Sequence, residues 1–461
     1  MLLRIAQKEI LLHVRESRFL WVAGLFCGLV VLGTALMSRD YARRLETYHT
    51  SLSAERRETF AVDGSQSIPR QVRALVNDRG IFAFRRPQEL APLASGLESA
   101  TPTQIHVSDT RSWSRQANES NYQNPLLGLF PRPDFSYVVA SILSLVALFF
   151  TFDAVCGEKW SGTLRLMMST AVSRDRVLVG KWIGSMVTLG IPFVLAILLG
   201  MVLLIVIGGV TPSGPTLARM AGIAGLGLLY LSLFVTIGLA VSVLARRPSS
   251  SLLICLTLWV ASTLVLPNLL ASVGRRLRPA QSYQQMQKRG IDREVREEYA
   301  RLRRENREKK ISDEERQRLG RLGWEEGEAE KGRIAEAYLR STGAQVTVSQ
   351  ALSRASPAAC LTYAASELAD TGLGYYQRAQ AAYAQYRRDF REYARRLRRE
   401  ADEEKLQSDW LQAEEIPALT IRSSTLGETV DAIATEVIVL ALVQVLAFAV
   451  AYVGFLRYDV R

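Results

Sequence analysis

Residues 182–210 read WIGSMVTLGIPFVLAILLGMVLLIVIGGV and contain no charged side chain. An α-helix rises about 1.5 Å per residue and the hydrocarbon core of a bilayer is about 30 Å thick, so about 20 apolar residues cross it. A helix of a water-soluble domain needs a polar face, which this run lacks. The run therefore predicts a membrane-spanning helix.

Five further segments have the same character, and only one of them holds a charged residue, Glu436. They are residues 19–37, 135–152, 220–245, 252–273 and 432–456. Six such runs in one chain cannot all be buried core helices, because core helices of soluble domains keep a wet side. The sequence predicts an all-α polytopic membrane protein with six transmembrane helices.

The overall composition excludes some classes of protein. The chain has 461 residues, of which 48% are hydrophobic and 22% charged, with a formal net charge of +12. Many arginines alternate with glutamates on predicted helices, which indicates solvated helix surfaces, so no nucleic-acid partner is expected. The four cysteines lie in segments of different kinds, some in hydrophobic spans and one in a polar insertion, so they do not form a disulfide framework. No intrachain disulfide is expected.

Positive residues gather in the segments that join the spans on one side. Residues 153–181 carry five Lys or Arg residues, residues 246–247 are both Arg, and two Arg residues lie in 457–461. The opposite turn, 211–218, has no charge. Short cytoplasmic loops are enriched in Lys and Arg, so the loop 153–181, the tail 457–461 and both termini are predicted to face the cytoplasm.

The first 18 residues precede the first span and carry charges of both signs, which argues against a cleaved signal peptide. They predict a partly amphipathic helix along the cytoplasmic membrane interface, with a solvated tail as the alternative. Its apolar residues are Leu2, Leu3, Ile5, Ile10, Leu12 and Val14.

Two long segments, 38–134 and 274–430, then fall outside the cytoplasm. The first is rich in Pro, Gly, Ser and Asn and predicts a mixed extracytoplasmic insertion of loops and a few strands. The second is highly charged and predicts a long extracytoplasmic helical hairpin. Residues 350–369 within it are apolar enough either to rest on the membrane interface or to cap the hairpin.

An aromatic heptad pattern supports the hairpin, and we interpret it as the core of the hairpin rather than a platform for a ligand. It comprises Tyr376, Tyr383, Tyr386, Phe390, Tyr393 and Leu397. A candidate facing stripe consists of Ile291, Val295, Tyr299 and Leu302.

No catalytic constellation is present. His13, His49 and His106 are not at metal-ligand spacing, so no metal site is expected. Residues 157–163 have the two glycines of a phosphate loop but place Thr163 where its lysine is required. We therefore expect no enzymatic activity and no cofactor in this chain.

The same stretch carries a family resemblance. Residues 152–168, FDAVCGEKWSGTLRLMM, followed by Ser173-Arg174 and Gly180-Lys181-Trp182, resemble the first cytoplasmic loop of ATP-binding-cassette permeases of the type-2 exporter class. In that family an acidic residue, a Gly-Thr-Leu and a short helix precede a Gly-Lys pair that opens the third span. Residues 455–461, Asn124-Pro125-Leu126 and Ser356-Pro357 are also similar to the family, in its subgroup with large extracytoplasmic insertions after the first and fifth spans.

The resemblance implies a multi-pass permease of the bacterial inner (plasma) membrane that pairs with a second permease chain, identical or different. It also implies a separate cytoplasmic ATP-binding-cassette ATPase that holds the ATP and Mg. The implied function is export driven by that ATPase. The alternative is a mechanotransmitter or scaffold that acts on an extracytoplasmic protein through the hairpin.

Each residue of the loop can be given a role in coupling to the ATPase. The segment from Thr163 to Thr170 is short and apolar, with Leu164, Leu166, Met167 and Met168, and predicts a coupling helix that docks in a groove of the ATPase. Glu158 would bind a backbone group or a basic partner, and Gly162 would permit a tight turn. Arg174 and Lys181 would pair with acidic groups or lipid phosphates. The alternative is an ordinary positively charged loop without a partner.

Glu436 and Gln444 form a possible intramembrane polar site in the last span. Glu436 lies close to the start of that span, so it is expected to reach lipid headgroups or water. A role in substrate binding or gating is the alternative, because buried ionisable groups in membranes are costly and usually functional.

Overall fold

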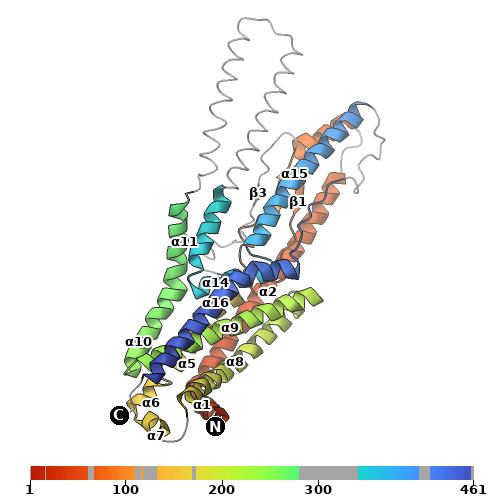
Figure 1. Cartoon of the computed structure of the whole chain (residues 1–461). Coiled ribbons are helices and arrows are strands. Elements are labelled where there is room, and N and C mark those ends of the chain that lie inside the picture. Colours follow the sequence, from red (N-terminus) through yellow and green to blue (C-terminus); the bar gives the residue numbers. More distant parts are fainter. Residues whose placement is uncertain are drawn as a thin grey trace.

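The structure is a computed structural model that describes residues 2–15, 17–60, 67–108, 116–117, 132–168, 173–279, 341–403 and 416–457. Within these residues, six helices are long and apolar enough to cross a membrane. This confirms the predicted all-α polytopic membrane fold with six spans. Figure 1 shows the spans as a bundle from which further helices project at one end.

Four of the spans are formed by single helices, namely α2 (Ser17–Phe60), α8 (Arg174–Val206), α9 (Gly214–Leu244) and α16 (Leu426–Leu456). The second span consists of α4 (Phe135–Val138), a π-helical turn η3 (Val139–Leu143) and α5 (Ser144–Thr151). The fifth consists of α10 (Pro248–Trp259), the π-helical turn η4 (Val260–Val265) and α11 (Leu266–Leu277). Side-chain caps fix two starts: Asp134 accepts a hydrogen bond from the amide of Tyr137, and Thr425 and Glu428 form a capping box.

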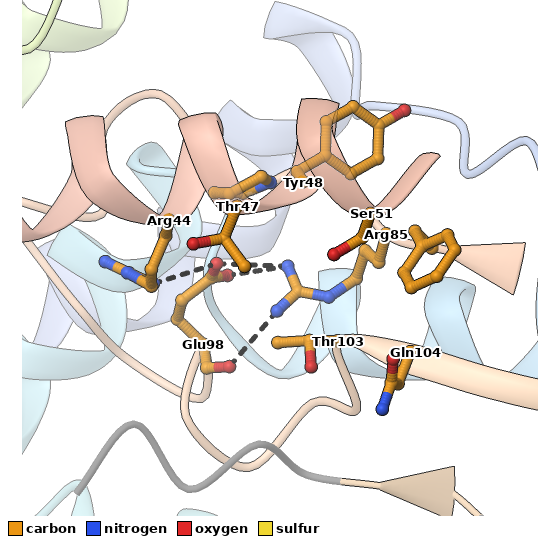
Figure 2. Close-up of a pocket in the computed structure, with 10 residues that line it drawn as sticks. Arg44, Thr47, Tyr48, Ser51, Arg85, Glu98, Thr103 and Gln104 are labelled. Atoms are coloured by element: carbon orange, nitrogen blue, oxygen red, sulfur yellow. Dashed lines mark hydrogen bonds and ion pairs between the residues drawn. The ribbon is translucent and has the colours of Figure 1, made fainter. Parts of the chain in front are cut away.

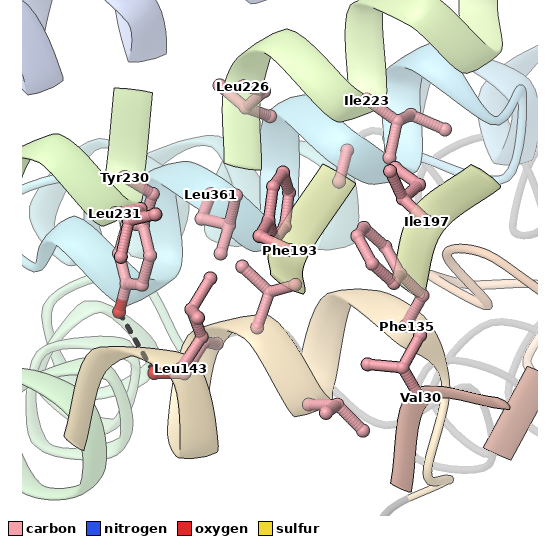
Figure 3. Packing of buried hydrophobic residues seen from close by; sticks show 14 of the residues in the cluster. Val30, Phe135, Leu143, Phe193, Ile197, Ile223, Leu226, Tyr230, Leu231 and Leu361 are labelled. Atoms are coloured by element: carbon pink, nitrogen blue, oxygen red, sulfur yellow. Dashed lines mark hydrogen bonds between the residues drawn. The ribbon is translucent and has the colours of Figure 1, made fainter. Parts of the chain in front are cut away.

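The fourth span, α9, lies at the centre of the bundle and packs against α5, α8 and α16. Large apolar side chains fill the space between these helices (Figure 3). The rings of Phe135 and Phe193 lie 6.0 Å apart, and the buried Tyr230 hydroxyl donates to the carbonyl of Ala140 over 3.1 Å. Burying a Tyr or Trp is favourable when its polar atom finds a partner, as it does here.

One end of the bundle holds α1 (Leu2–Arg15), α6 (Cys156–Trp160) and α7 (Thr163–Met168), as Figure 1 shows. We refer to it as the α7 end. The last residues of α16 also lie there, since Phe455 packs in the same apolar cluster as Leu164 of α7.

At the opposite end, α2 continues as one helix to Phe60, far beyond residue 37, so residues 38–60 of the first insertion are helical rather than the expected loops. Residues 39–59 are rich in Arg, Glu, Ala and Leu, which favour helix. Arg44 also pairs with Asp40 over 3.1 Å, one turn earlier. The helix therefore needs no membrane to continue.

The rest of the first insertion contains α3 (Ile68–Arg73), the π-helical turn η1 (Ala74–Arg79), and strands β1 (Ile81–Phe84), β2 (Gln104–Val107) and β3 (Gln116–Ala117). The strands form an antiparallel sheet in the order β1-β2-β3, with Ile81 opposite Val107. The predicted few strands are thus present among the described residues.

The aromatic pattern lies on α15 (Leu373–Asp402), and its partner is the first insertion (Figure 1). Five of the six predicted residues are buried, and Tyr375 replaces the half-buried Tyr376. The covering side chains are Val72, Leu75, Val76, Ile81, Ile105 and Val107. The aromatic residues form a buried core, as predicted, but this core is shared between the two insertions. The candidate facing stripe from Ile291 to Leu302 lies outside the described residues. We call residues 38–60, 67–107 and α15 the projecting unit.

A different segment runs back along α11. Residues 341–353 are helical, and Ser349 and Ser353 donate to the carbonyls of Ala271 and Pro267 over 3.3 Å and 3.5 Å. This register is antiparallel, so the described base of the predicted hairpin is formed by 341–353 rather than by the aromatic stripe of α15. Gly274 permits the close approach, because a Cβ there would lie 2.5 Å from Ser349.

Residues 350–369 were predicted to lie on the membrane or on the hairpin, and the structure shows a third arrangement. They contain α14 (Pro357–Leu368), which lies between the ends of the spans and packs against α9 and α16. Cys360 and Leu361 are fully or nearly fully buried there. In Figure 3, Leu361 lies among the core side chains next to Tyr230 and Phe193.

Candidate functional site

Two carboxylates and two ammonium groups meet at the α7 end. Lys181 of α8 places its Nζ 2.8 Å from Glu9 of α1 and 3.0 Å from Glu158 of α6. Lys8 of α1 adds a second contact of 3.0 Å to the same Glu158 oxygen. The Lys181 side chain is only 1% exposed, so it requires these anionic partners in its low-dielectric surroundings. The network joins α1, α6 and α8.

The start of α6 is attached to the central span α9. Ser242 Oγ accepts hydrogen bonds from the amides of Val155 and Cys156 over 2.9 Å and 3.0 Å. These amides belong to the N-cap residue and to the first residue of α6, where helices have unpaired donors. Lys159 in turn donates to the carbonyl of Val243, close to the end of α9. A cation at that end is favourable because helix carbonyls point there.

A tight turn separates α6 from α7. Gly162 has φ +75°, and a Cβ there would meet nothing within 4 Å. The requirement for glycine is therefore conformational, since this region of backbone space is unfavourable for other residues. The predicted turn at Gly162 is present.

The helix that follows the turn is anchored by one side chain. Leu164 is 0% exposed and packs against residues of α8, α9 and α16, among them Val177, Val243 and Phe455. The side chain of Leu164 is therefore covered within the chain, and its role in coupling to an ATPase stays a prediction. Met167 is half-buried against the same cluster.

The opposite side of α7 is open to solvent. Leu166 is 72% exposed, and Trp160 at the end of α6 is 67% exposed with the guanidinium of Arg247 5.6 Å from its ring centre. Thr163 is also exposed, and its Oγ1 lies 2.9 Å from Ser161 Oγ. Large apolar side chains that remain exposed on a short helix are candidates for contact with another molecule.

Arg174, at the start of α8, reaches across to the end of α16 and donates to the carbonyls of Phe455 and Leu456. Pairing of Arg174 with acidic groups or lipid phosphates stays a prediction, and these carbonyls are partners that the sequence did not indicate. Their attraction for a cation follows from the unpaired carbonyls that every helix end presents.

The two polar residues of the last span have separate partners. Glu436 is 2% exposed and forms an ion pair of 2.8 Å with Arg354, which precedes α14. The expectation that Glu436 reaches headgroups or water is wrong, because α14 covers it. Gln444 donates to Thr236 Oγ1 of α9 over 2.8 Å. They do not form one site.

Sequence reasoning missed Glu9 and Ser242. Glu9 lies one turn after the buried Ala6 on α1, so it is a charged residue on the face that packs inward. A charge on the apolar face of an amphipathic helix is a usable signal for a buried ion pair. Ser242 carries no such signal, because a serine in an apolar span most often bonds its own helix.

A second polar cluster lies in the projecting unit (Figure 2). Arg85 and Glu98 form an ion pair of 3.0 Å with side chains 2% and 1% exposed, and Arg44 of α2 approaches Glu98 to 3.4 Å. Tyr375 lies beside Arg85, and burial raises the pKa of its hydroxyl. The pocket in Figure 2 holds about 50 Å³, and a second pocket of about 430 Å³ is also lined by Arg85 and Tyr375. The contact between Arg44 and Glu98 connects this part of the insertion to α2.

No group of three or more His, Cys, Asp or Glu residues that could hold a metal ion is found in the part of the chain that the structure describes. Comparison with curated proteins gives no match. The family model of ABC-2 family transporter proteins matches residues 3–460. The match covers nearly the whole chain, with its six spans and the loop that contains α6 and α7. The protein is therefore a member of the ABC-2 family of transporters, a multi-pass membrane component.

Proposed function

We propose that this chain is the permease subunit of an ATP-binding-cassette exporter and that α7 docks on a separate ATPase subunit. The observation that carries the proposal is the two-sided character of α7. One side, at Leu164, is fixed in a cluster shared by three spans, and the other presents Leu166 to solvent. A short helix with one fixed and one open face is suited to docking in a groove.

The connections of α6 and α7 explain how docking would move the spans. Ser242 and Lys159 join the segment to α9, and Lys181 joins it to α8. Leu164 packs in the apolar cluster that also contains Phe455 of α16. A displacement of α7 cannot occur without moving the ends of these helices or breaking those contacts. An ATPase whose two nucleotide states bind α7 differently would thus shift the conformational equilibrium of the bundle.

The proposal places the α7 end in the cytoplasm of a bacterium, with the inner membrane around the six spans. The positive residues of 153–181 and 246–247 support this orientation. ATP and Mg would bind the ATPase, since residues 157–163 lack the lysine of a phosphate loop. A second permease chain and lipid would cover the exposed apolar side chains of α10 and α16.

Co-purification from a strain that co-expresses the chain with a candidate ATPase tests the proposal. Leu166→Glu would place a charge in the docking groove, so we expect loss of the ATPase from the purified complex and loss of permease-dependent ATP turnover. Leu217→Glu is the matched control, because Leu217 is also exposed but lies in the first turn of α9 at the opposite end. An ATPase that binds the Leu166→Glu chain as well as the unaltered chain would refute the docking role.

A second function is favoured by the direct connection between the spans and the projecting unit. The chain passes from α14, which is buried among the spans, to α15, which forms the projecting unit, in four residues, Ala369–Gly372. The exporter would then also transmit force to an extracytoplasmic protein. A variant that lacks residues 280–340 and still exports substrate would show that this part of the insertion is unnecessary for export.

A further inference from the structure

We propose that α14 transmits movement of the spans to the projecting unit, and that the ion pair between Arg354 and Glu436 is the contact through which α16 moves α14. The inference rests on the proposed function, because the movement would come from the ATPase. It adds a specific path from the membrane bundle to the extracytoplasmic surface. It also assigns a role to Arg354 and Glu436, which lie outside the site around α7.

The start of α14 is attached to two different spans. Arg354 donates through Nε and Nη2 to Glu436 of α16 over 2.9 Å and 2.8 Å. Ser356, the N-cap of α14, donates to the carbonyl of Ser262 in the fifth span over 2.6 Å. Its oxygen also accepts from the amide of Ala359 and thereby caps the helix. A shift of α16 relative to the fifth span must therefore displace or break these contacts.

The end of α14 is attached to the central span. Arg219 of α9 is 8% exposed and donates to the carbonyl of Leu368, the last residue of α14, over 3.1 Å. Arg219 also donates to Ser424, which precedes α16. Gly222, one turn later, allows Leu368 to pack closely, since a Cβ there would lie 2.9 Å from it. Both ends of α14 are thus held by spans.

The link from α14 to α15 is short and held by hydrogen bonds. Asp370 adopts a left-handed backbone conformation, with φ 55°, and its Oδ1 accepts from Arg378 of α15 and from Ser424. Thr371 donates to the carbonyl of Ala94, and its own carbonyl accepts from the amide of Leu97, both in the first insertion. The link therefore passes displacement of α14 to both halves of the projecting unit rather than absorbing it.

Of the residues along this path, Glu436 can be substituted with the least damage to packing. A carboxylate buried at 2% exposure within a span is costly unless it is paired, and Arg354 supplies the charge. Arg354 is 29% exposed and borders a cavity of about 230 Å³ that Glu367 and Glu428 also line. Glu436→Gln therefore releases Arg354 toward water and other carboxylates and leaves the shape of α16 unchanged.

Hydrogen-exchange mass spectrometry of the full permease–ATPase complex tests the path. Hydrogen exchange is measured in residues 156–168 and in α15. The complex trapped with ATP and vanadate is compared with the nucleotide-free complex. In the unaltered complex we expect trapping to change exchange in both segments. In Glu436→Gln we expect the change in 156–168 to remain and the change in α15 to be lost. Arg354→Lys retains the charge, so it should keep part of the change in α15.

Glu428→Gln is the matched control, because Glu428 lies on α16 too but is exposed and pairs with Arg422. It should leave the change in α15 intact. A change in α15 of equal size in Glu436→Gln and in the unaltered complex would overturn the inference. Trapping that changes neither segment of the unaltered complex would instead refute the proposed ATPase coupling.

The native Cys360 of α14 provides a readout that needs no nucleotide. It is 0% exposed, and its Sγ lies 3.1 Å from the carbonyl of Arg354. If the ion pair holds α14 in place, Glu436→Gln should raise the labelling rate of Cys360 by a water-soluble maleimide about tenfold, which corresponds to about 1.4 kcal/mol. Labelling is quantified on the Cys360 peptide, with Glu428→Gln as control. An unchanged labelling rate would overturn the inference, whether or not the ATPase proves to be coupled to the permease.

Discussion

The ammonium of Lys181, buried near the start of α8, lies 3.0 Å from the carboxylate of Glu158 in the loop that leads to α7. This contact joins a membrane helix to the segment that we propose receives force from the ATPase. Its geometry is reinforced by Glu9, which approaches the same ammonium to 2.8 Å. Three segments distant in sequence thus share one buried cation.

Replacing Lys181 by Met should destabilise the protein strongly. Glu9 would retain a carboxylate that is 6% exposed with its partner removed, and breaking a buried ion pair in this way costs roughly 3–5 kcal/mol. The midpoint of thermal unfolding should fall markedly. Lys8→Met is the control: the Lys8 side chain is 50% exposed, and exposed pairs contribute about 0–1 kcal/mol. Equal shifts for the two variants would contradict a buried network.

Leu164 and Leu166 should respond oppositely to truncation. Leu164→Ala removes a fully buried side chain and should cost roughly 2–5 kcal/mol of stability. Leu166→Ala truncates a side chain that is 72% exposed, so stability should stay within about 0.5 kcal/mol. Only Leu166→Ala should weaken ATPase binding while the permease remains as stable as before. Thermal unfolding and a binding titration, performed on the same preparations, separate the two effects.

Gly162→Ala should impair coupling through the backbone. No neighbour lies within 4 Å of an added Cβ, so the expected cost is the roughly 1–2 kcal/mol of placing an alanine at φ +75°. Asn tolerates this conformation better than Ala, and Gly162→Asn should therefore retain more ATPase stimulation. Equal ATP turnover in the two variants would indicate that the turn is not left-handed in the working complex.

Phe390→Ala should loosen both insertions together. Phe390 is 0% exposed in the core that α15 shares with the first insertion, and Phe→Ala in a core costs roughly 3–5 kcal/mol. Hydrogen exchange should accelerate in α15 and in β1 alike, while the spans keep their protection. Gln385→Ala on the exposed face of the same helix should change neither. Acceleration confined to α15 would mean that the first insertion has a core of its own.

The spans could be predicted because charge-free runs of such length have one physical explanation, whereas the partners of the insertions could not. The spacing of Tyr383, Tyr386 and Phe390 indicated a buried face, and that face is buried. Nothing in a heptad pattern says which segment covers it, and the first insertion does so. The pattern included Tyr376, whereas the buried residue is Tyr375. The cause is the same, because only the covering segment decides which of these two neighbouring tyrosines is buried.

At the candidate site, the local features followed from the sequence and the long-range ones did not. The turn at Gly162 depends on one residue's own conformation, so its sequence signal is direct. Leu164 and Leu166 look alike in sequence, and only the positions of Val177 and Phe455 decide which of them is buried. Glu436 was misplaced for the same reason, since its partner Arg354 is 82 residues away along the chain.

The central claim is that α7 contacts an ATPase, and photo-crosslinking at position 166 tests it most directly. A photoreactive amino acid at Leu166 of the membrane-embedded complex should give a crosslink to the ATPase subunit whose yield changes between the nucleotide-free and ATP-bound states. The same residue at Leu217, at the opposite end of α9, should give none. Crosslinks from position 166 to lipid alone, with the ATPase present and active, would contradict the account.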